Sequence, residues 1–68
     1  MPLSTPTPLG EVLFEFRQLG STVKVSAVHV ATNTEVAVVG PPGAGEVVLR
    51  NLALQKLRYV LGKQGMPL

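Results

Sequence analysis

The chain has 68 residues, no cysteine, a formal net charge of +2 and a pI near 9.5. This length allows one small domain, and the lack of cysteine excludes disulfides and thiolate metal sites. Hydrophobic residues make up 46% of the chain and charged residues only 15%, against roughly 25% charged in an average domain. So small a domain is marginally stable alone. We therefore expect a homodimer that uses no metal or other cofactor.

The ends of the chain differ from its middle. Residues 1–9 contain three prolines, which prevent a helix and remove sheet donors, so we expect them to be disordered. A single domain is expected over residues 10–63, followed by a flexible tail over 64–68. The first residues lack the basic start and apolar stretch of a signal peptide, and no apolar run approaches the ~20 residues that span a bilayer. We expect a cytoplasmic protein that does not engage a membrane.

Three segments are predicted to form strands because apolar and polar residues alternate in them: 11–19, 22–30 and 35–39. Gly20-Ser21 and residues 31–34 separate them as turns, with Asn33 expected to take a positive φ. Turns this short predict an antiparallel meander.

The alternation changes phase within the second strand. Val23 and Val25 share one face, whereas Val28 and Val30 fall on the other. A bulge near Ala27-Val28 would restore one apolar face, and burial of both faces in an oligomer would also account for the pattern.

A long C-terminal helix is predicted from about residue 44 to residue 62, where proline is absent and helix formers dominate. At 100° per residue, its main apolar stripe consists of Leu49, Leu52, Ala53, Leu57 and Val60. The stripe is expected to cover a sheet face led by Val12, Phe14, Phe16, Val23, Val25 and Val38. The sequence thus predicts an α+β fold, a three-stranded meander followed by one helix.

The helix carries more apolar residues than one sheet needs. Val47, Leu54 and Leu61 recur at the spacing of a helix–helix contact, and Val48 and Tyr59 widen the arc on the other side. We therefore predict a dimer interface formed by Val47, Leu54, Leu61 and Tyr59.

The segment GPPGAGE over residues 40–46 resembles a phosphate-binding loop only superficially. A P-loop needs Gly-Lys-Ser/Thr, and here Gly45 precedes Glu46; a dinucleotide fingerprint needs a third glycine, and that position is Val48. The prolines are expected to end the third strand, and the glycines to let the chain reverse onto the sheet. Glu46 would then complement the helix dipole.

Few side chains suggest catalysis. His29 is the sole histidine and lies among valines, which favours a packing or interface role over that of a general base. Glu11 and Glu15 share a strand face with Arg17, an arrangement more typical of solvated charges than of an acid pair. No nucleophilic, acid–base or metal-ligating set is assembled, so we expect no enzymatic activity.

Two functions are consistent with this sequence. The first is a structural or protein-interaction module that presents its dimer surface to a larger protein partner. The alternative is a weak nucleic-acid-binding protein, which would use basic residues brought together on the assembled dimer: Arg17, Lys24, Arg50, Arg58 and Lys63. These residues are dispersed along the chain, and this dispersion favours the first function.

Four segments resemble recurring stretches of a family of short uncharacterised proteobacterial proteins: LFEF (13–16), VKVSAV (23–28), TEVAVVGPP (34–42) and ALQKLRYVL (53–61). The resemblance covers residues 11–62. It implies a compact, dimeric strand-and-helix fold with no assigned activity, and it transfers no functional residues.

Overall fold

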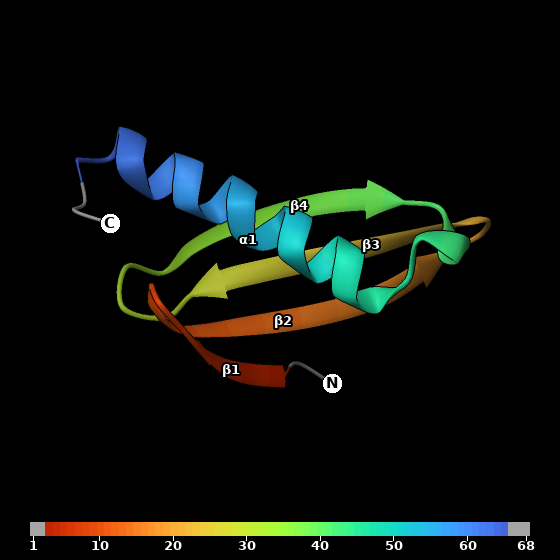
Figure 1. The fold of residues 1–68 in the computed structure, drawn as a ribbon, viewed down its shortest axis with the longest axis horizontal. Helices are drawn as coiled ribbons and strands as arrows, with labels where there is room; N and C mark the ends of the chain where they lie inside the picture. Colours follow the sequence, from red (N-terminus) through yellow and green to blue (C-terminus); the bar gives the residue numbers. More distant parts are fainter. Residues whose placement is uncertain (1–2, 66–68) are drawn as a thin grey trace.

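A computed structural model describes residues 3–65, which form a four-stranded antiparallel sheet with one helix packed on one of its faces (Figure 1). The strands follow chain order across the sheet: β1 (Leu3–Thr7), β2 (Gly10–Leu19), β3 (Thr22–His29) and β4 (Thr34–Gly40). A short 3-10 turn, η1 (Pro42–Ala44), leads into α1 (Glu46–Lys63). The predicted α+β class, antiparallel meander and C-terminal helix are confirmed.

The prediction of three strands is wrong, because residues 3–7 of the supposedly disordered segment form β1. Thr5 pairs with Val12, and Thr7 pairs with Gly10. The Thr7 hydroxyl donates to the carbonyl oxygen of Gly10 at 2.7 Å and accepts from the N–H of Leu9 at 3.1 Å, which fixes the turn between β1 and β2. Side-chain bonding within the turn therefore offsets the low strand propensity of the prolines.

Both edges of the sheet carry features that discourage pairing with another strand. On β1, Pro6 pairs with Glu11, whose carbonyl oxygen accepts from the N–H of Val30 at 3.2 Å and therefore faces β3. In such a pair the main chain of Pro6 faces the free edge, where its missing N–H costs nothing. On β4, the opposite edge, Nζ of Lys56 donates to the main-chain oxygen of Ala37 at 2.9 Å. Proline and lysine at exposed edges are recognised safeguards against edge-to-edge association.

Of the two explanations considered for the change of phase in β3, the bulge near Ala27-Val28 is wrong. The β2–β3 register is continuous from the Leu19–Thr22 pair to the Val12–His29 pair. The inner face of β3 ends on His29, which is fully buried although polar. The apparent change of phase arose because a histidine occupies a core position while valine occupies the outer face.

The core lies between α1 and the inner face of the sheet, and its members are Val12, Phe14, Val25, Ala27, Val36, Leu49, Ala53, Leu57 and Leu61. The other predicted core residues of the sheet, together with Val60, are partly buried and pack against this cluster. The prediction for Leu52 is wrong, since this side chain is largely exposed and Leu61 is buried in its place. A step of four residues overshoots one helical turn by about 40°, so the buried line winds around α1 and moves away from Leu52.

The glycines at the start of the helix serve the backbone. Gly45 precedes α1 with φ 86° and ψ 151°, a conformation essentially restricted to glycine. At Gly40, an added Cβ would lie 2.5 Å from Cδ2 of Leu49, so the first helical turn packs directly on the end of β4. Glu46 lies in the first turn as predicted, and Asn33 has the predicted positive φ, 55°.

We expect Gly45→Ala to lower the free energy of unfolding by about 1–3 kcal/mol, because alanine pays the steric cost of this backbone conformation. Gly43→Ala is the matched control: it lies two residues away, has no positive φ, and an added Cβ would meet nothing within 4 Å. Urea unfolding followed by circular dichroism measures both variants. Equal losses in the two variants would show that the loop does not need glycine at position 45.

Candidate functional site

The helix carries a line of exposed apolar side chains on the side away from the core. Val48, Leu52 and Tyr59 are 51%, 46% and 64% exposed, respectively. Steps of four and seven residues keep them on one face of a helix, and we call this set the outer stripe. Nζ of Lys63 lies 5.2 Å from the centroid of the Tyr59 ring, a cation–π contact at the C-terminal end of the stripe.

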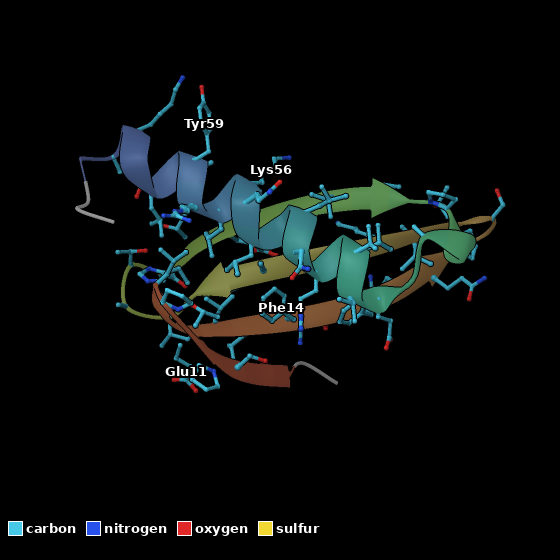
Figure 2. All side chains as sticks on the ribbon, in the orientation of Figure 1. Glu11, Phe14, Lys56 and Tyr59 are labelled. Carbon is cyan, nitrogen blue, oxygen red and sulfur yellow. The ribbon has the colours of Figure 1, made fainter. Side chains whose placement is uncertain are left out.

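The outer stripe lies on the β4 side of α1. Lys56, three residues before Tyr59, reaches down to β4, which places this flank of the helix above the β4 edge. Figure 2 shows Lys56 and Tyr59 projecting from the side of α1 opposite Phe14, which lies beneath the helix. The stripe and the edge strand therefore border the same side of the molecule.

The structure distributes the predicted interface residues over different places. Tyr59 belongs to the outer stripe, but Val47, although 62% exposed, lies on the other flank of α1. Leu54 is half-buried on that same flank, and Leu61 is fully buried in the core, so it presents no surface to a partner. The prediction grouped Val47, Leu54 and Leu61 because they are seven residues apart. In the structure the line of buried residues winds around α1 and includes Leu61, which is why Leu61 belongs to the core. Val48, which widened the predicted apolar arc, and Leu52 are the residues that sequence reasoning left out of the interface.

Two hollows lie on the β1 side of α1, and together we call them the β1-side groove. The larger, of about 340 Å³, is lined by Pro8, Leu9, Asn51, Leu54, Gln55 and Arg58. The smaller, of about 120 Å³, is lined by Thr5, Phe14, Phe16, Glu46, Val47 and Arg50. The groove is therefore apolar at its base, with arginine and glutamate side chains along the helix.

The predicted basic set does not form one patch on the chain. Arg17 and Lys24 are directly opposite each other on the outer face of the sheet. Arg50 and Arg58 line the β1-side groove, and Lys63 lies over Tyr59 at the end of the helix. A nucleic-acid backbone is bound by charges that follow one path. On a single chain these residues divide between the outer face of the sheet, with Arg17 and Lys24, and the helix, where Arg58 and Lys63 border one depression.

His29 is held by a hydrogen-bonded chain that links three parts of the molecule. Its Nε2 lies 2.7 Å from the carbonyl oxygen of Leu9, which can only accept, so Nε2 donates. In the neutral ring Nδ1 then accepts from the hydroxyl of Thr32 at 2.7 Å. Thr32 in turn lies 2.8 Å from the hydroxyl of Thr34, which is 3.4 Å from Oε1 of Gln64 after the helix. The buried histidine thus ties the β1–β2 turn to the β3–β4 turn and the end of α1.

The Thr32–His29 contact has the distance of a hydroxyl nucleophile and its base. A reacting hydroxyl also needs a hollow that seats its substrate, and the hollows of the β1-side groove are lined by other residues. Both ring nitrogens of His29 are engaged by the protein itself. The contact is therefore explained by the satisfaction of a buried polar side chain.

Over residues 3–65, no cluster of three or more His, Cys, Asp or Glu side chains is placed to hold a metal ion. Within the same residues, no helix has the length and apolar character needed to cross a bilayer.

We expect His29→Leu to lower the free energy of unfolding by about 1–3 kcal/mol, because the Leu9 carbonyl and the Thr32 hydroxyl lose their partner. Thr32→Val removes one of the two bonds and should cost about 1 kcal/mol. In the double variant the two losses should not add, since both single changes remove the same contact. Urea unfolding of the four proteins completes the cycle, and strict additivity would show that the contact contributes nothing.

Lys56→Met keeps the apolar stem of the side chain but removes the donor to Ala37 on the edge of β4. We expect the free energy of unfolding to change by no more than about 1 kcal/mol, while concentration-dependent association rises because the edge is less protected. Light scattering and thioflavin fluorescence over a concentration series measure this association. Lys24→Met, which removes one charge from the central strand β3, is the control; an equal rise in both would attribute the effect to net charge.

The comparisons with curated proteins and with solved structures found no match. A family model described as a domain of unknown function, DUF6898, matches residues 9–64. The match spans β2, β3, β4 and α1, and it includes all four segments on which the predicted resemblance rests. The prediction of an uncharacterised family is confirmed: this chain belongs to the DUF6898 family of domains of unknown function.

Proposed function

We propose that this chain is a non-enzymatic protein-interaction module that acts as a homodimer, with the outer stripe of α1 as its dimer interface. The observation that carries the proposal is the exposure of Val48, Leu52 and Tyr59 on a helix whose opposite side is already buried. A helix that packs against one sheet normally has polar residues on its other side. A helix that is apolar on both sides is normally buried on both sides by other parts of the protein or by a partner.

The other surfaces of the molecule support an interface on the helix. Pro6 and Lys56 protect the two sheet edges. The outer face of the sheet mixes apolar side chains, among them Leu13 and Val28, with the charged side chains of Glu15, Arg17 and Lys24. Charge therefore interrupts its apolar area, as is common for a sheet face in water. The outer stripe has neither protection nor charge at its centre, so it is the surface best suited to become buried.

A dimer formed in this way leaves uncovered the part of the β1-side groove next to Leu9, Leu54 and Val47, while Gln55 and Arg58 border both the groove and the interface. We propose that these free surfaces are what the dimer presents to a larger protein partner. A nucleic-acid role is supported less well, since the basic residues of one chain lie on separate surfaces. The two roles differ in salt dependence: phosphate-led binding weakens steeply as salt is added, and an apolar contact does not.

We expect Leu52→Glu to weaken dimerisation by at least about 100-fold, or about 3 kcal/mol, because a carboxylate would be buried at the centre of the interface. Leu19→Glu is the matched control, since Leu19 is 48% exposed against 46% for Leu52 and, by the alternation along β2, lies on the sheet face opposite the helix. Sedimentation or native mass spectrometry over a concentration series measures the mass of each protein.

The expected result is a wild-type dimer, a dimeric Leu19→Glu variant and a monomeric Leu52→Glu variant. A wild-type monomer at all concentrations would overturn the homodimer. Two variants that both remain dimeric would move the interface away from the outer stripe.

A further inference from the structure

We propose that the two α1 helices of the dimer pair antiparallel about a two-fold axis near residues 53–54, so that Tyr59 of each chain packs on Val48 of the other. The inference rests on the proposed homodimer and adds its geometry. A two-fold interface brings the same surface of two copies together, so the outer stripe must fit itself. The stripe runs from Val48 to Tyr59, about 16 Å along the helix axis. Two copies can pair with their helices antiparallel or parallel, and the two arrangements bring different residues of the stripe into contact.

The shape of the helix surface favours the antiparallel direction. Beside Tyr59 the surface has a shallow, wide-open depression lined by Gln55, Arg58, Tyr59, Gly62 and Lys63. At the other end of the stripe, Val48 projects from α1 and is half exposed. An antiparallel pair places the projecting valine of each chain at the depression of the other, twice by symmetry. Interfaces pack well when projecting side chains meet recesses and large residues face small ones.

A parallel pair would bring like ends together. It would place Tyr59 against Tyr59, leaving the two valines facing each other across a gap. It would also bring the Lys63 side chains together, each of which lies over its own Tyr59 ring, and like charges at close range oppose association. The antiparallel pair instead keeps the two Lys63 side chains at opposite ends of the helix pair, and it places opposite ends of the helix dipoles side by side.

The chain lends itself to a direct test, because it contains no cysteine and each introduced thiol is therefore unique. Two single variants, Val48→Cys and Tyr59→Cys, change exposed side chains and should leave the fold intact. One of the two variant proteins carries an affinity tag, so that a covalent dimer containing one chain of each variant differs in mass from a dimer of either variant alone. The two proteins are oxidised separately and together, and covalent dimers are counted on a non-reducing gel and by intact mass.

We expect disulfide-linked dimers in the mixture, containing one chain of each variant, and few in either protein alone. Two cysteines can be bridged only when their Cα atoms lie within about 7 Å, and in an antiparallel pair two copies of Val48 lie about 16 Å apart along the axis. A second pair, Leu52→Cys with Gln55→Cys, lies at the centre of the stripe, where either direction of pairing brings the thiols to within about 4.5 Å along the axis. This pair tests whether the stripe is the interface, and the direction is read from the first pair alone. Leu19→Cys, on the sheet face opposite the helix, is the control and should not cross-link with any of them.

Other outcomes are separated by first taking the native mass of the unmodified chain and of each reduced variant. Efficient cross-linking of each variant with itself, but not in the mixture, would establish parallel helices and overturn this inference while leaving the homodimer. Dimeric proteins that cross-link in neither combination would place the interface elsewhere and also overturn it. A monomeric unmodified chain would overturn the homodimer itself.

Discussion

The fold depends on one helix packed on the inner face of the sheet, mainly over β3 and β4. That contact is made by four residues in steps of four, Leu49, Ala53, Leu57 and Leu61, which are buried almost completely. Alanine at the second position lets the helix approach the sheet closely, and Gly40 lets the end of β4 meet the first turn of α1. Because the helix packs this closely on the sheet, the winding of its buried line decides which residues are exposed on the other side. Apolar residues such as Leu52 are therefore exposed in spite of their apolar character.

Polar contacts hold the end of the molecule where the β1–β2 turn, the β3–β4 turn and the end of α1 lie. His29 occupies the last inner position of β3, where an aliphatic side chain would be expected, and is bonded through both ring nitrogens. Its partners belong to the β1–β2 turn and the β3–β4 turn, so one imidazole fixes two connections that share no strand. A small domain without disulfides gains from such a contact, because it orders loops that the apolar core does not reach.

Most of the fold could be predicted from the sequence, because alternation in the strands and the absence of proline in the helix are local signals. β1 was missed since its prolines obscure the alternation, and only the register with β2 shows that Pro6 faces the free edge. The phase of β3 was misread because a buried histidine looks like a surface residue in sequence. The candidate site was predicted least well: a helical wheel does not show where the sheet twists, so Leu61 was assigned to the surface and Leu52 to the core.

The contrast between the sheet and the helix bears most directly on function. Exposed strand edges are the surfaces through which small β proteins associate without specificity, and here one edge lacks a donor at Pro6 while the other has an acceptor at Ala37 occupied by Lys56. No comparable device protects the outer stripe, where the lysine nearest Tyr59 lies over the ring and leaves the apolar line open. Partial protection of both edges, beside a helix with one apolar side, would restrict association to that side in the dimer that we propose. Such a restriction supports a defined pair of helices over open-ended assembly.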